Sequence, residues 1–179
     1  MKLNLSKKLI AAAAGLMLVA AAPVAGFAQD TIKLGVVGPH SGDLASYGLP
    51  SVNAAKILAE QINAAGGING KKIELLVEDT VCDAKTATDV ATKLVSDGAQ
   101  IVLGGICSGS TKAALPIYKD SGILVMSPSA TNPALTQSGD YDNFFRTIAP
   151  DDAQAQLDVD FALDKLGYTK IAVVHDKGD

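Results

Sequence analysis

Short apolar runs alternate with longer segments of helical periodicity along most of the chain. Each run is three to six residues long and nearly free of charge, which is typical of strands buried on both faces of a parallel sheet. The runs that fit this pattern are residues 32–37, 73–77, 101–103, 123–126 and 144–149, with a further run at 168–175. We therefore expect six strands.

The segments between the runs show apolar residues at the spacing of one helix face. This spacing occurs before Gly66-Gly67 at Val52, Ala55, Ile57, Leu58, Ala59 and Ile62. Residues 84–96 repeat the pattern before Gly98. Further helices are expected at residues 110–118 and from Asp151 or Asp152, either of which can cap the helix, to about residue 166. Strands that alternate with helices predict an α/β fold with a doubly wound parallel sheet.

The last expected strand is followed by Lys177-Gly178-Asp179 and by no crossover helix. A parallel strand without such a helix leaves one face of its sheet uncovered. The pattern thus predicts a truncated chain whose missing part includes most of a second lobe.

The N-terminus has the organisation of a secretory signal peptide. Lys2, Lys7 and Lys8 precede an apolar stretch, and small residues lead to Ala28, after which we expect cleavage. The stretch is short for a membrane span, and no cysteine near the cut could carry a lipid. We expect residues 1–28 to be removed and the remainder to reach the periplasm without stable membrane insertion.

The charge balance changes once this leader is set aside. Three of the 15 basic residues lie within residues 1–28, which hold no acid, so the rest of the chain has 12 basic and 19 acidic residues, a net charge of −7. Nucleic acid and anionic membrane are therefore not expected as partners.

Cys82 and Cys107 are the two cysteines. An even count in an oxidising compartment predicts a disulfide, worth about 3 kcal/mol in the chain-entropy model. Two buried free thiols are the alternative. A catalytic Cys107 is disfavoured because no histidine is near it in sequence and oxidation would remove the nucleophile.

Hydroxyl-rich loops, residues 107–111 and 127–133, follow two of the expected strands. Because parallel strands end at one edge of a sheet, both loops border the crevice where such folds bind ligands. The loops offer small donors and acceptors but no acid or base, which indicates a binding protein rather than an enzyme. His40 and His175 lack metal-ligand spacing, so no metal or other cofactor is expected.

The signatures of three common enzyme classes are absent. No Gly-x-Gly-x-x-Gly turn follows the first strand, and no phosphate loop is present. The stretch from Gly105 to Gly109 misses a nucleophile elbow by one residue.

Several motifs occur together and in order along the chain. They are Val36-Val37-Gly38 to Ser41-Gly42, Gly66-Gly67-Ile68-Asn69-Gly70, Cys82-Asp83, Cys107-Ser108, Ser127-Pro128-Ser129-Ala130-Thr131-Asn132-Pro133, Leu135-Thr136, Arg146-Thr147 and His175-Asp176-Lys177. With these motifs the chain resembles the leucine/isoleucine/valine-binding proteins of bacterial ABC transporters, which have the type I periplasmic binding fold. The resemblance implies two lobes joined by a three-crossing hinge, which capture a free branched-chain amino acid and deliver it to permease subunits. Residues 29–148 would form the first lobe and residues 149–179 the start of an incomplete second lobe.

The same resemblance implies a set of ligand-binding residues. Ser108 would contact the ligand carboxylate, Thr131 the head group and the Ser129 backbone carbonyl the ammonium, with Ala130 in the same loop and Tyr47 packing near the ligand. Local roles are the alternatives: Ser108 can cap a helix, although Ser110 is the better cap, and residues 129–131 can form an ordinary turn. Tyr47 can be an ordinary loop residue.

The resemblance leaves the ligand open within the fold. Urea, a short amide, an aromatic acid or another amino acid could be bound instead, and the fold also serves as the sensing domain of receptors.

Overall fold

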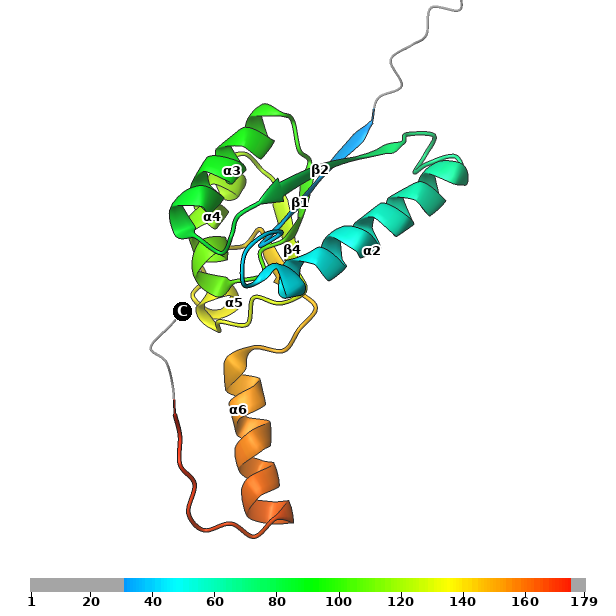
Figure 1. Ribbon diagram of the computed structural model, residues 1–179. Helices are drawn as coiled ribbons and strands as arrows, with labels where there is room; N and C mark the ends of the chain where they lie inside the picture. The colour runs from blue at the N-terminus through cyan, green and yellow to red at the C-terminus, as the bar shows by residue number, and fades with distance from the viewer. Residues whose placement is uncertain (1–30, 175–179) are drawn as a thin grey trace, which may run out of the picture.

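The computed structural model describes residues 31–174, and the expected signal peptide therefore lies outside the described residues. A five-stranded parallel sheet forms the centre, with strand order β2-β1-β3-β4-β5. Helix α2 covers one face of the sheet, and α3 and α4 cover the other (Figure 1). The predicted doubly wound α/β architecture is confirmed.

Most element bounds lie close to those predicted, but α2 begins earlier and β5 ends earlier than expected. The strands are β1 (Ile32–Gly38), β2 (Ile73–Asp79), β3 (Ile101–Gly104), β4 (Leu124–Ser127) and β5 (Phe144–Arg146). The helices are α2 (Ala45–Ala64), α3 (Ala84–Ser96), α4 (Ser108–Asp120), α5 (Ala134–Gln137) and α6 (Asp151–Asp160), and α6 continues into a π-helical turn, Phe161–Lys165.

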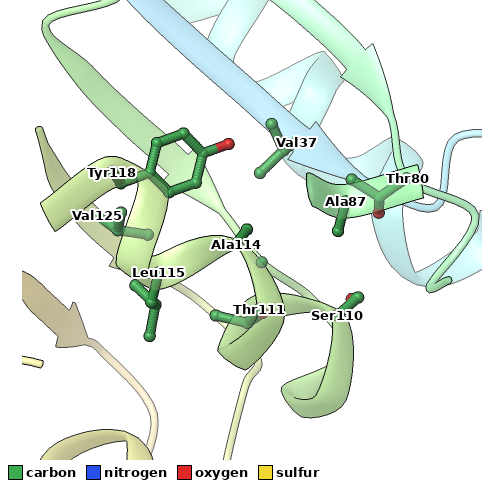
Figure 2. Close-up of a pocket in the computed structure, with 10 residues that line it drawn as sticks. Val37, Thr80, Ala87, Ser110, Thr111, Ala114, Leu115, Tyr118 and Val125 are labelled. Atoms are coloured by element: carbon green, nitrogen blue, oxygen red, sulfur yellow. The ribbon is translucent and has the colours of Figure 1, made fainter. Parts of the chain in front are cut away.

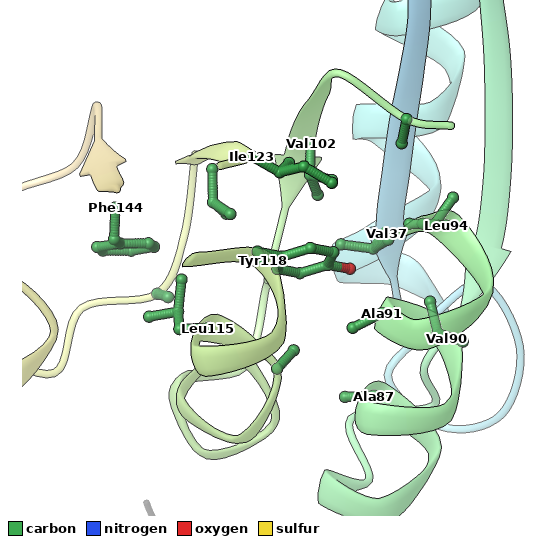
Figure 3. Packing of buried hydrophobic residues seen from close by; sticks show 14 of the residues in the cluster. Val37, Ala87, Val90, Ala91, Leu94, Val102, Leu115, Tyr118, Ile123 and Phe144 are labelled. Carbon is green, nitrogen blue, oxygen red and sulfur yellow. The ribbon is translucent and has the colours of Figure 1, made fainter. Parts of the chain in front are cut away.

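The two sides of the core meet at neighbouring residues of β1. Successive strand side chains point to opposite faces. Val37 packs with Leu94 and Tyr118 in the larger cluster beneath α3 and α4 (Figure 3). Val36 packs with Val52 and Ala55 of α2 in the smaller cluster on the other face.

The α2 side of the sheet is only partly covered. Leu124 of the inner strand β4 is 49% exposed, and Met126 of the same strand and Phe145 of the edge strand β5 are also exposed. A groove with an apolar lining runs between α2 and this part of the sheet, from Leu58 to Met126.

Two predictions about local structure in the C-terminal part are wrong. Residues 168–174 form no strand, and Val174 is 92% exposed, because no neighbouring strand within the described residues offers hydrogen bonds to this segment. Neither Asp151 nor Asp152 caps α6. The N-cap residue is Pro150, with no side-chain cap bond, and Asp151 is the first helical residue.

Candidate functional site

The site lies where the strand order of the sheet reverses. From β1 the chain moves outward to β2 and then crosses to β3 on the other side of β1. In doubly wound sheets, ligands bind beyond the carboxyl ends of the strands at such a switch point. An open pocket occurs here among the loops after β1, β3 and β4, lined by Leu44, Tyr47, Ile106, Cys107 and Ser129.

A disulfide joins Cys82 and Cys107, with their Cα atoms 5.6 Å apart, so the predicted pairing is confirmed. It ties the turn after β2 to the residue that precedes α4. Val81 and Cys82 have φ angles of 44° and 58°, a region that β-branched residues rarely adopt. The disulfide thus fixes a turn with an unfavourable backbone conformation beside the pocket.

Ser108 is buried and is the first residue of α4. Its hydroxyl oxygen accepts a hydrogen bond from the Asn132 N–H at 3.1 Å. The N-cap residue is Cys107, and the Ser110 hydroxyl donates to the Cys107 carbonyl at 3.1 Å. The interpretation of Ser108 or Ser110 as the helix cap is therefore wrong, because α4 begins two residues earlier than the apolar pattern indicates.

The loop after β4 exposes some backbone groups and engages others. The Ser129 and Ala130 N–H groups donate to the Ser127 hydroxyl, and the Ala130 carbonyl accepts from Arg146. Over residues 31–174 we find no hydrogen bond to the Ser129 carbonyl or the Thr131 hydroxyl. These two groups remain available to a ligand, whereas Ala130 is fully buried with both backbone groups bonded.

Tyr47 lies in the first turn of α2, not in a loop as expected, and its side chain is 65% exposed. It lines the pocket together with Cys107 and Ser129. Gly48 allows this turn to approach the preceding loop, because a Cβ atom at this position would lie 2.1 Å from the Pro39 carbonyl oxygen.

Ser127, Arg146 and Asp79 organise the loops, and sequence reasoning assigned them no role. Arg146 donates to the carbonyls of Ala130 and Asn132 at 3.2 and 2.9 Å and to the Thr136 hydroxyl. Asp79 accepts from the His40 N–H at 2.8 Å and the Ser41 hydroxyl at 2.6 Å. All three residues end a strand, and Ser127 and Arg146 also stand in motifs that carry the resemblance, but neither signal shows which groups they bond.

The charge of Asp79 is stabilised by these contacts. Partial burial raises the pKa of its carboxyl, but hydrogen bonds from Ser41, from the His40 N–H and from the Val81 N–H outweigh this and lower the pKa below its ordinary value. Burial likewise lowers the pKa of His40, against the opposing charges of Asp79 and Glu78. We therefore expect a neutral imidazole next to an ionised carboxylate at neutral pH.

A second, enclosed cavity lies behind the site between α4 and the sheet. Figure 2 shows its lining, which includes Val37, Leu115 and Tyr118, all members of the main hydrophobic core. Burial raises the pKa of the Tyr118 hydroxyl far above its ordinary value, so this group stays protonated. The cavity is part of the packed interior and offers a ligand no entry comparable with the open pocket.

Among residues 31–174, no group of three or more His, Cys, Asp or Glu side chains is placed to hold a metal ion. Within the same residues, no helix is long and apolar enough to cross a membrane.

The fold and the loop cluster define a doubly wound α/β protein with an open pocket at the switch point of its sheet. A family model described as periplasmic binding protein matches residues 31–179. The chain belongs to the periplasmic binding protein family, as the resemblance in its motifs predicted.

One curated relative is the leucine-, isoleucine-, valine-, threonine- and alanine-binding protein of Pseudomonas aeruginosa. It is 44% identical over 165 residues, which are 89% of this chain and 44% of the relative. The chain thus spans less than half the length of this relative.

Solved structures share the fold. A branched-chain amino acid transporter substrate-binding protein from Streptococcus pneumoniae, in complex with isoleucine, is 35% identical with a TM-score of 0.71. The match covers 77% of this chain and 39% of that one. A solute-binding protein from R. palustris in complex with benzoate is 27% identical with a TM-score of 0.65, over 77% of this chain and 38% of that one.

Proposed function

We propose that this chain is the ligand-binding part of a branched-chain amino acid receptor for an ABC transporter. Residues 29–148 form its first lobe, and residues 149–179 begin a second lobe that closes over the ligand. The protein works in the periplasm after cleavage behind Ala28 and delivers leucine, isoleucine or valine to membrane permease subunits. It performs no chemistry on the amino acid.

The observation that carries this proposal is the pairing of free polar groups at the switch point. The Ser108 hydroxyl has one acceptor position occupied by the Asn132 N–H, which leaves its hydrogen free to donate to a carboxylate. The unbonded Ser129 carbonyl and Thr131 hydroxyl suit an ammonium group. A zwitterionic head group presents both partners, so these residues fit a free α-amino acid.

The apolar part of the pocket suits the side chain of such a ligand. Leu44, Tyr47 and Ile106 line the open pocket together with Cys107 and Ser129. Ser108 and Thr131 are not among its lining residues, but each follows a lining residue within the same loop. One methylene more or less in an apolar pocket changes binding by about 1–3 kcal/mol. We therefore expect leucine, isoleucine and valine all to bind. The order of their affinities would depend on the pocket walls that both lobes contribute.

The experiment that tests the proposal is calorimetric titration of the ligand-free protein with both lobes, using leucine, isoleucine, valine, phenylalanine, benzoate and urea. The proposal predicts binding of the three branched-chain amino acids in preference to the others. Binding of benzoate or urea with no heat from leucine would contradict it.

Capture of an aromatic acid is a second candidate, favoured by the benzoate complex of the R. palustris relative. Benzoate presents a carboxylate to Ser108 but no ammonium to the Ser129 carbonyl. A compound that separates the two candidates is 4-methylvalerate, which is leucine without its amino group. A site for aromatic acids or simple carboxylates should bind 4-methylvalerate, whereas an amino acid site should bind it far more weakly than leucine.

A further inference from the structure

Ser127, the last residue of β4, has a fully buried side chain whose hydroxyl makes three hydrogen bonds. It donates to the Gly105 carbonyl at 2.6 Å and accepts from the Ser129 and Ala130 N–H groups at 3.1 and 2.8 Å. A hydroxyl group has one donor and two acceptor positions. All three are used within the protein, so Ser127 has no capacity left for a ligand.

These bonds join the two loops that carry the polar groups of the pocket. Gly105 begins the loop that leads to Ser108, and Ser129 and Ala130 begin the loop that leads to Thr131. The Gly105 backbone, with φ of 71°, lies so close to α4 that a Cβ atom would come within 2.3 Å of the Thr111 hydroxyl oxygen. Gly105 therefore packs closely against α4, and no residue with a side chain fits at this position.

Arg146 holds the same loop from β5. Its guanidinium donates to the carbonyls of Ala130 and Asn132, the residues on either side of Thr131. Hydrogen bonds from a charged donor are stronger than those between neutral groups, and the planar guanidinium fixes the geometry of its acceptors. Ser127 and Arg146 together engage the backbone around Thr131 and leave its hydroxyl and the Ser129 carbonyl unbonded.

We propose that Ser127 is a positioning residue of the ligand site, with Arg146 as its partner. It contacts no ligand but fixes the direction of the Ser129 carbonyl and the Thr131 hydroxyl before the ligand arrives. A preorganised loop raises affinity because its ordering does not oppose binding. This inference rests on the proposed function and deepens it by naming what shapes the head-group site.

The test compares Ser127→Ala with Asn143→Ala in the protein with both lobes. Asn143 is also buried and donates to the Ile123 carbonyl at 3.1 Å, but it lies at the amino ends of β4 and β5, away from the pocket. Both variants lose a buried hydrogen bond. Titration with leucine should show binding weakened by about 10- to 100-fold in Ser127→Ala and unchanged in Asn143→Ala, although both unfold at lower temperature.

Amide hydrogen exchange gives a readout that needs no ligand. The Ala130 amide should exchange much faster in Ser127→Ala than in the wild type, and as slowly as in the wild type in Asn143→Ala. If Ser127→Ala fails to fold, Arg146→Gln replaces it, with the same expected losses of affinity and of Ala130 protection.

The leucine titration of the wild type tests the proposed function, and the comparison of the variants tests the positioning role of Ser127. Wild-type protein that does not bind leucine contradicts the proposed function, and exchange at Ala130 still decides whether Ser127 holds the loop. Unchanged leucine affinity, or unchanged Ala130 exchange, in the substituted protein overturns the positioning role.

Discussion

The Ser108 hydroxyl oxygen and the Asn132 backbone nitrogen lie 3.1 Å apart, joined by a hydrogen bond across the two loops of the pocket. The two residues are 24 positions apart in sequence and follow different strands. Ser108 therefore has two tasks in the proposed site: it orders the loop after β4, and it presents its free hydrogen to the ligand.

Ser108→Ala should weaken leucine binding by about 1–3 kcal/mol, because a carboxylate loses a donor and the Asn132 N–H loses its acceptor. Calorimetric titration of the protein with both lobes measures this. Ser110→Ala is the matched control, since it removes a buried hydroxyl in the same turn of α4 whose partner is the Cys107 carbonyl. Equal affinities in Ser108→Ala and the wild type would limit Ser108 to a structural role.

Thr131→Val keeps the shape of the side chain and removes its hydroxyl. We expect a similar loss of about 1–3 kcal/mol in leucine binding, with little change in the unfolding temperature, because the hydroxyl has no partner among the described residues. Thr131→Ser serves as the control that restores the hydroxyl. An unaffected dissociation constant in Thr131→Val would mean that the hydroxyl does not face the ligand.

The contact between Thr131 and α6 gives a separate prediction. The Asp151 N–H donates to the Thr131 carbonyl at 3.0 Å, and Asp151 is the first residue of α6. Proline is well tolerated at this helical position but has no N–H to donate. Asp151→Pro should therefore leave α6 intact by circular dichroism and weaken leucine binding, because the ligand loop loses its tie to the segment that leads into the second lobe.

Asp151→Asn is the control for this substitution, since it removes the same charge but keeps the N–H. Should Asp151→Asn weaken binding as much as Asp151→Pro, the carboxylate and not the backbone bond would be responsible.

Asp79 makes stability depend on pH in the acid range. Its pKa in the folded protein is lowered, so the ionised form contributes stability above the unfolded value near 3.8, and this contribution is lost as the pH falls through the folded pKa. Urea unfolding should show Asp79→Asn less stable than the wild type by about 1–3 kcal/mol at neutral pH. The difference should shrink as the pH falls below the unfolded value near 3.8 and through the lowered pKa of the folded protein. A difference that is constant with pH would contradict this account.

How far the sequence predicts this structure depends on the element. Residues 84–96 form α3 as predicted, because Asp83 accepts from the Thr86 N–H at its start and Gly98 follows its end. Helix α2 begins at Ala45, well before the predicted Val52, since Gly48 and Pro50 obscure its first turns. Residues 168–174 have a strand-like composition, but a strand also needs a neighbour, which composition does not reveal.

The site, like the fold, has features that the sequence predicts and others that it does not. The loops after β3 and β4 were predictable, because the ends of parallel strands share one edge of the sheet. The role of Ser127 was not, because it depends on Gly105, 22 residues earlier, coming within hydrogen-bond distance. Arg146 likewise reaches back to Ala130 and Asn132 from β5, a contact that only the folded sheet creates.

Calorimetric titration of the ligand-free protein with both lobes against leucine and its deaminated analogue 4-methylvalerate tests directly whether the site recognises an amino acid. We predict that leucine binds and that the analogue binds far more weakly, because the Ser129 carbonyl and Thr131 hydroxyl then lack the ammonium. Equal binding of the two compounds, or no binding of leucine, would contradict an amino acid site at the switch point of this sheet.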